Sequence, residues 1–291
     1  MKRSPFLCLA LLPILACGGS KPEPETPADA PAGRVASVAP TPSGSSAVAA
    51  KPDEKEDMTP VHWKNFPGPK VKVDVKGATD AWVALPTGPE VSFESFVDIN
   101  VGHVIRAEAN ELVVETFAGH REVFVPGLFV HPMVKATGLT KGTVVLVGAG
   151  GGTTYARVES TSGDQVKVRY DWGGQSSGTE EPSERVIKVE EKVTWGARVM
   201  DGDNQPLKVL ASDREKTWVV TLFGIPSQVD TSTLKPMKIA KVLKKGDKVL
   251  AGTQSLEPGV VTEAIDGGTA YKVKLDGGKE ERFAFADVTT P

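Results

Sequence analysis

The chain has 291 residues, of which 40% are hydrophobic and 24% are charged, and its formal net charge is −3. This composition is that of an ordinary soluble protein. Basic residues are not in excess, so the composition predicts no nucleic-acid partner. The only cysteines are Cys8 and Cys17. A disulfide framework, a thiolate metal site and cysteine catalysis are therefore excluded from the rest of the chain.

Residues 1–16 predict a secretory signal, because two basic residues precede about ten apolar ones, too few to cross a bilayer. The ILAC stretch that ends at Cys17 resembles the lipobox of bacterial lipoproteins. The resemblance implies cleavage before Cys17, acylation of this cysteine by chains such as palmitate, and a lipid anchor in the cell envelope. By the same resemblance, Gly18 implies sorting to the outer membrane. An ordinary signal cut near Ala16 or Gly18, or an uncleaved anchor, is the alternative.

Residues 17–60 form a segment rich in proline and alanine. From position 18 onward the segment contains eight of the 22 prolines and no aromatic residue. Such a composition cannot bury enough apolar surface to offset its ordering entropy, so we expect a disordered linker. The linker would hold the ordered region away from the membrane; a passive tail is the alternative.

After Trp63 the sequence alternates valine with polar residues in short stretches that glycine-rich turns separate. This pattern predicts half-buried strands, and no window of ten residues favours a helix, so we expect an all-β protein. The turns are marked by SGD at 162–164, DGDN at 201–204, DGG at 266–268 and DGG at 276–278. The expected strands are 71–75, 143–147, 165–170, 217–223, 248–251 and 270–275.

An internal duplication sets the domain organisation. KGTVVLVG at 141–148 returns as KGDKVLAG 104 positions later, at 245–252, and other short stretches return at nearly the same distance. Each copy also divides in two, which predicts four modules. About fifty residues supply five short strands, and a sheet of this size covers its edges by curling into a small barrel. The modules are module 1 (70–137), module 2 (138–190), module 3 (191–240) and module 4 (241–291).

Two modules carry a recognisable pattern. In module 2 a Lys-Gly pair precedes the first strand, YARV at 155–158 opens the second, VKVRY at 166–170 is the third, and a Glu-rich fourth ends at 184–186. Modules 2 and 4 resemble Tudor-like (SH3-like) barrels, and modules 1 and 3 resemble them more weakly. The resemblance implies four tandem barrels. We expect modules 1 and 2, and modules 3 and 4, to form two compact halves.

The candidate binding site is an aromatic cluster in module 2. Tyr155, Tyr170 and Trp172 stand at the ends of strands, and Asp171 lies beside them. Modules of this family that bind ligands often do so with an aromatic cage around a cation. The alternative is that the two tyrosines close the end of the barrel while Trp172 packs on a neighbouring module. Module 4 has no tryptophan to repeat the cage, which favours this alternative.

Module 1 holds three of the four histidines, His103, His120 and His131. No His-x-His or Cys-x-x-Cys spacing brings them to one metal ion, so we expect surface histidines, no metal and no cofactor. The GAGGGT stretch at 148–153 lacks the Gly-Lys-Ser/Thr ending of a phosphate loop and is typical of a hairpin turn. No catalytic constellation emerges from the sequence.

These observations predict a non-enzymatic, membrane-anchored envelope lipoprotein that binds or scaffolds through tandem barrels. Its partners would be an envelope protein, a peptide or a glycan, held in loops and clefts between barrels. One alternative is a metal-dependent enzyme with its site in module 1. Another is a purely structural envelope spacer.

Overall fold

A computed structural model describes residues 61–77, 79–86, 91–93, 95–115, 122–149 and 152–291. The predicted signal, Cys17 and the predicted linker lie outside the described residues. The chain from Lys55 to Pro291 forms one compact unit. Its described residues contain no helix with the length and apolar character needed to span a membrane.

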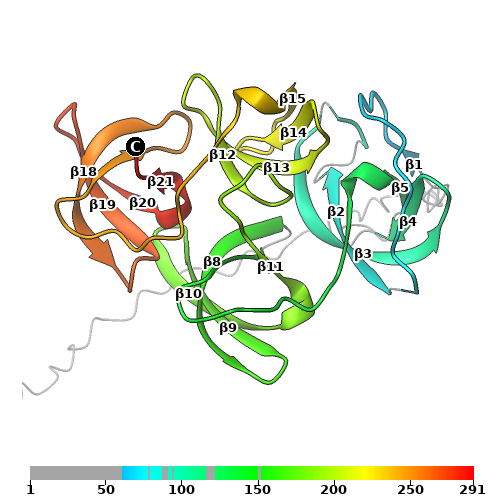
Figure 1. Cartoon of the computed structure of the whole chain (residues 1–291), viewed down its shortest axis with the longest axis horizontal. Coiled ribbons are helices and arrows are strands. Elements are labelled where there is room, and N and C mark those ends of the chain that lie inside the picture. The colour runs from blue at the N-terminus through cyan, green and yellow to red at the C-terminus, as the bar shows by residue number, and fades with distance from the viewer. Residues whose placement is uncertain (1–60, 78, 87–90, 94, 116–121, 150–151) are drawn as a thin grey trace, which may run out of the picture. The chain divides into compact units, whose positions relative to one another are not determined.

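The described residues form strands joined by turns, which confirms the all-β prediction. Figure 1 shows four small sheets, one for each predicted module. The sheet of module 1 consists of β1 (Val61–His62), β2 (Asp80–Pro86), β3 (Val97–Ala107), β4 (Glu111–Glu115), β5 (Glu122–Pro126) and β6 (Val130–Pro132). It therefore also takes in two residues that precede the predicted start at 70.

The other three sheets have five strands each. Module 2 contains β7 (Val144–Ala149), β8 (Gly152–Ser162), β9 (Gln165–Trp172), β10 (Gln175–Pro182) and β11 (Val186–Lys188). Module 3 contains β12 (Arg198–Met200), β13 (Pro206–Ser212), β14 (Lys216–Val220), β15 (Pro226–Asp230) and β16 (Lys235–Pro236). Module 4 contains β17 (Lys248–Ala251), β18 (Glu257–Ile265), β19 (Ala270–Leu275), β20 (Glu280–Ala284) and β21 (Val288–Thr289).

All four sheets share one topology. Four antiparallel strands follow one another, and a 3-10 turn then returns the chain so that a last short strand pairs with the first. Only β1, which pairs in parallel with β5, is an addition to this plan. The return strand brings both ends of the meander together, as expected for four tandem small barrel-like modules. The four turns are η1 (Gly127–Phe129), η2 (Ser183–Arg185), η3 (Thr231–Thr233) and η4 (Phe285–Asp287).

The duplication is visible in individual hydrogen bonds. The amide of Gly142 donates to the carbonyl of Val158 at 2.8 Å, and the amide of Gly246 donates to that of Val261 at the same distance. Both glycines have positive φ, 89° and 94°, which side chains disfavour. The second strand of every module carries a β-bulge, and in β8 and β18 it begins at Val158 and Val261. The repeated KG letters thus encode the start of the same bulged hairpin.

Most expected strands are present. Two of them, 248–251 and 270–275, agree with β17 and β19 residue for residue. The strand expected at 71–75 is wrong, because these residues form no ladder, although Val73 and Val75 are buried. In this stretch the alternation of valines reflects burial against the rest of module 1 and not sheet pairing.

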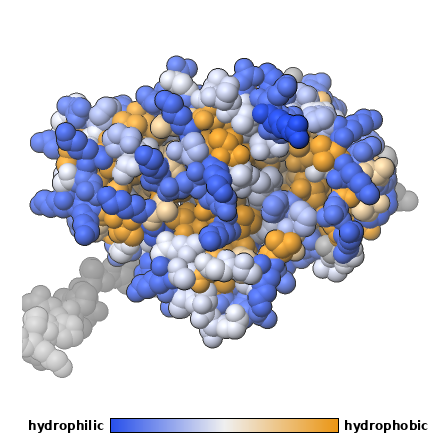
Figure 2. Space-filling model, viewed as in Figure 1, coloured by the Kyte–Doolittle hydropathy of each residue, from blue (hydrophilic) through white to orange (hydrophobic). Residues whose placement is uncertain are grey.

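The expectation of half-buried strands is also wrong for β7, the first strand of module 2. Val144, Val145, Leu146 and Val147 of β7 are all buried. Val145 and Val147 face the small core of module 2, whereas Val144 and Leu146 belong to a large cluster with residues of all four modules. Modules 2 and 3 therefore each have an inner core and an outer apolar face that packs on neighbouring modules. Hydrophilic residues border the hydrophobic patches left at the surface (Figure 2).

The expectation of two separate halves is wrong. Module 2 packs directly on module 4, and module 1 on module 3, inside the one compact unit. One example is the amide of Val97 in β3, which donates to the carbonyl of Gly224 in module 3 at 2.8 Å.

Candidate functional site

A cavity with a volume of about 730 Å³ lies where all four modules meet. Module 1 contributes the start of β3, and module 2 contributes the start of β8, the end of β9 and the glycine that follows β9. Module 3 contributes the turn after β14 together with two charged side chains, and module 4 contributes the end of β20 and η4. No single barrel could form this cavity.

Four large apolar side chains line the cavity and are also exposed to solvent. Phe96 is 58% exposed, Trp172 52%, and Leu222 and Phe223 51% each. Among the described residues, Phe96, Trp172 and Phe223 are all the exposed aromatic side chains there are. These four residues, which we call the apolar rim, come from three different modules. Exposed apolar groups gathered in this way mark interaction surfaces.

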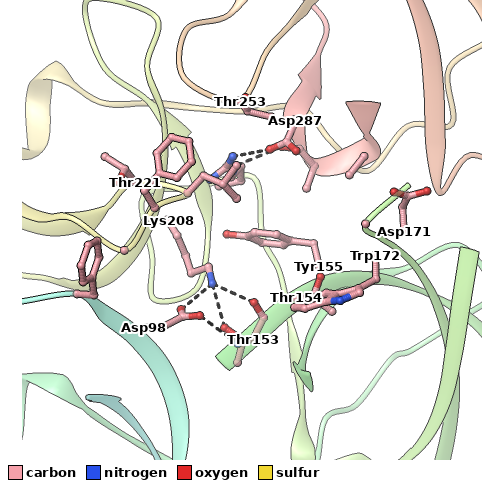
Figure 3. A pocket seen from close by; sticks show the side chains of 18 of the residues that line it. Asp98, Thr153, Thr154, Tyr155, Asp171, Trp172, Lys208, Thr221, Thr253 and Asp287 are labelled. Carbon is pink, nitrogen blue, oxygen red and sulfur yellow. Dashed lines mark hydrogen bonds and ion pairs between the residues drawn. The ribbon is translucent and has the colours of Figure 1, made fainter. Parts of the chain in front are cut away.

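The wall of the cavity contains a buried lysine that joins three modules. The Nζ of Lys208 in β13 donates to Asp98 Oδ1 at 2.7 Å, to Thr153 Oγ1 at 3.0 Å and to the Thr153 carbonyl at 3.1 Å (Figure 3). Burial lowers the pKa of Lys208, and the Asp98 carboxylate opposes this shift. A Cβ atom at Gly152 would collide with the Asp98 carboxylate. Gly152, the last glycine of GAGGGT, therefore makes room for the Asp98 carboxylate, which also accepts from the main-chain amide of Thr153 at 3.2 Å.

A second buried ion pair joins module 3 to module 4. The Nη2 of Arg198 in β12 donates to Asp287 Oδ1 at 2.6 Å, and its Nε donates to the carbonyl of Ala286 at 3.2 Å. Burial raises the pKa of Asp287 above its ordinary value, although the Arg198 guanidinium opposes this shift. Loss of one partner would leave a buried charge uncompensated, so the pair fixes the two modules to each other.

Tyr155 lies between the two ion pairs and points toward the cavity (Figure 3). Arg198 Cζ and Lys208 Nζ are each 5.9 Å from the centre of its ring. The hydroxyl of Tyr155 donates to the carbonyl of Gly196 at 3.0 Å, which links module 2 to module 3. Burial raises the pKa of Tyr155 far above its ordinary value.

The structure brings together three of the four residues of the predicted aromatic cluster. Tyr155, Asp171 and Trp172 line the cavity, whereas Tyr170 packs against the inner core of module 2 and is absent from the lining. Asp171 forms an ion pair with Arg282 of module 4. The rings of Tyr155 and Trp172 thus belong to a cavity shared by four modules and not to a cage within one barrel.

Sequence reasoning missed the contributions of the other modules. The sequence does carry a signal for the charged residues of module 3. Arg198 and Lys208 interrupt apolar runs in ARVM and PLKVLA, where a polar residue needs a buried partner. Phe96, Leu222 and Phe223 have no such signal. Phe96 directly precedes β3, Leu222 and Phe223 are in the turn after β14, and only the packing of modules 1 and 3 brings them to one cavity.

The described histidines are His62, His103 and His131. Within the described ranges, no group of three or more histidine, cysteine or acidic side chains could hold an ion. His103 Nδ1 lies 3.1 Å from Asp80 Oδ1, and His131 stacks on Trp195 with ring centres 4.8 Å apart. Burial lowers the pKa of His131. His120 lies outside the described residues.

No protein-family model matches this chain, and no curated protein matches its sequence. The chemistry of the cavity must therefore be inferred from its own residues. The apolar rim can cover apolar groups of a ligand, and the wall presents charges that are already paired. This arrangement suits non-covalent binding.

Proposed function

We propose that this chain is a lipid-anchored bacterial envelope lipoprotein with tandem Tudor-like barrels that binds a partner non-covalently, without catalysis. Cys17 would carry the acyl chains, residues 17–60 would act as the spacer, and the outer membrane would be the location. The observation that carries the binding role is the cavity of about 730 Å³, lined by all four modules and bordered by the apolar rim.

Three features support binding in this cavity. Its volume falls in the range of roughly 300–1,000 Å³ that is typical of ligand sites. Its wall is held in place by the Lys208 and Arg198 ion pairs, so the site is preformed and little ordering is needed on binding. Its apolar rim is exposed and ready for contact.

The lipid anchor can be tested by metabolic labelling with palmitate in a bacterial host. We expect the wild-type chain and a Cys8→Ser variant to incorporate label and to sediment with membranes. A Cys17→Ser variant should do neither. Cys8 is the matched control because it lies inside the predicted signal, which is removed. Labelling of the Cys17→Ser protein would refute the anchor.

The binding role can be tested by site-specific photo-crosslinking in intact cells. A photoreactive amino acid at Trp172 should give discrete cross-linked products. The same amino acid at Val134 serves as the control, because Val134 is 64% exposed but does not line the cavity. Identical products from both positions, or none from Trp172, would argue against a partner at the cavity. An envelope defect in a deletion strain, combined with no cavity-specific product, would instead support a structural spacer.

A further inference from the structure

We propose that the occupant of this cavity is an uncharged segment of a partner polypeptide that inserts bulky apolar side chains between the residues of the apolar rim. This inference rests on the proposed binding function and adds the chemical class of the ligand. Three observations carry it: the composition of the rim, the pairing of the charges and the presence of hydroxyl groups without partners.

The composition of the rim favours apolar side chains as the ligand. Three of its members are aromatic, and Leu222 is aliphatic. Large apolar and aromatic groups at the centre of a contact provide most of the binding energy between proteins, because they exclude water from a well-packed patch. A saccharide could lay the C–H face of one sugar ring on an aromatic ring, but Leu222 and Phe223 offer no partner to its remaining hydroxyl groups, which favours a peptide over a glycan.

The charges in the cavity favour an uncharged ligand. The lining contains three carboxylates, Asp98, Asp171 and Asp287, and each already pairs with a cation. The two cations of the lining, Arg198 and Lys208, are the partners of Asp287 and Asp98. A charged group on the ligand would have to break one of these pairs or lose its own water without compensation, and either event opposes binding. A neutral segment avoids both.

The hydroxyl groups of the cavity favour a peptide over a purely apolar molecule. Thr154 and Thr253 line the cavity, and in the part of the chain that the structure describes neither side chain has a hydrogen-bond partner. A hydroxyl can donate to a carbonyl or accept from an amide. Main-chain groups of an inserted segment would satisfy both threonines, whereas an acyl chain would leave them unpaired.

The inference can be tested by selecting a phage-displayed library of random heptapeptides on the full-length protein in detergent. We expect the enriched peptides to carry aromatic or aliphatic residues and no net charge. Their affinity should fall at least tenfold for Phe223→Asp and for Trp172→Ala. The affinity should stay within twofold for Val134→Asp, the exposed control outside the cavity. Circular dichroism and urea midpoints would show that each variant folds.

Other outcomes would overturn the inference in distinguishable ways. Enriched peptides that require a charged residue but still depend on Phe223 would refute the uncharged ligand and leave the binding function intact. Neutral oligosaccharides that bind in a Phe223-dependent manner, without any peptide enrichment, would replace a peptide by a glycan. If neither probe depends on Phe223 or Trp172, and photo-crosslinking at Trp172 also gives no product, the inference and the proposed function fail together.

Discussion

The guanidinium carbon of Arg157 lies 4.3 Å from the centre of the Phe285 ring, although Arg157 belongs to module 2 and Phe285 to module 4. The same guanidinium donates to the carbonyls of Gly268 at 3.0 Å, Ala240 at 2.8 Å and Ile239 at 2.9 Å. One side chain of the second barrel thus holds both the fourth barrel and the segment that leads into it. Arg157 is 4% exposed, and its bonds to Gly268 and Ile239 are buried.

Replacing Arg157 with methionine should strongly destabilise the protein. The substitution keeps much of the apolar stem but removes the donor from the buried carbonyls of Gly268 and Ile239 and from the partly buried carbonyl of Ala240. Each unsatisfied buried group costs about 1–3 kcal/mol. We expect the free energy of unfolding, measured by urea titration, to fall by at least about 3 kcal/mol. Arg169→Met is the control, because Arg169 pairs with Glu159 on the surface, where such pairs contribute about 1 kcal/mol or less. Equal losses in both variants would show that the Arg157 contacts do not hold the modules together.

The Lys208 and Asp98 pair should behave non-additively. Lys208→Met alone leaves the Asp98 carboxylate partly buried and uncompensated, so we expect a loss of about 3–5 kcal/mol. In the double variant with Asp98→Asn no uncompensated carboxylate remains, and the amide oxygen can still accept from the main-chain amide of Ile99, although the amide of Thr153 loses its Oδ2 acceptor. The double variant should therefore be more stable than Lys208→Met. A double variant that loses the sum of the two single effects would exclude coupling.

Tyr155 should make stability fall at alkaline pH. Its pKa in the folded protein is raised above the ordinary value of 10.0, because burial disfavours the phenolate. Above pH 10 the unfolded chain loses this proton while the folded chain keeps it, so ionisation favours unfolding. The cost is about 1.4 kcal/mol for each pH unit.

The measurement for Tyr155 is the free energy of unfolding between pH 9 and pH 11. Tyr155→Phe should be less stable than wild type at pH 9, because it lacks the hydrogen bond to Gly196. The difference should shrink as the pH rises above 10. Tyr170→Phe, at a ring outside the cavity, is the control and should follow the wild-type slope. An unchanged slope in Tyr155→Phe would contradict the prediction.

The repeated KG turn gives a test of backbone conformation alone. Gly246 has φ of 94° and no atom within 4 Å of the place that a Cβ atom would take, so Gly246→Ala adds strain without a collision. We expect a loss of about 1–2 kcal/mol in unfolding free energy. Gly148→Ala is the matched control, because Gly148 also has open space around it but no positive φ. Thermal unfolding that shows equal midpoints for the two variants would disprove the strain.

The sequence predicts the modules well because their signals are local. Alternating valines, glycine turns and the repeat at 104 positions arise from short-range geometry, and β17 and β19 follow from them directly. The stretch 71–75 shows the limit, since the same alternation can bury valines without making a strand. Periodicity reports which residues face a core and not which hydrogen bonds form.

The site can be predicted from the sequence only in part. Tyr155, Asp171 and Trp172 can be identified because they cluster within one module. Phe96 and Phe223 are 127 positions apart in the sequence and meet only through the packing of modules 1 and 3. That packing depends on the outer faces of the barrels. An unbroken apolar run such as VVLV at 144–147 indicates that both faces of the strand are buried, but it does not indicate which module covers the outer face.

The hydrogen bonds that Arg157 donates to carbonyls of other modules limit how the chain can lose a module in evolution. In solenoid proteins each repeat touches only its neighbours, so units can be gained or lost at the ends with little disturbance. Here module 2 contacts module 4 directly, although module 3 lies between them in the sequence. Loss of module 4 would remove the Gly268 carbonyl and the Phe285 ring that Arg157 contacts, so this module cannot be lost without disturbing module 2.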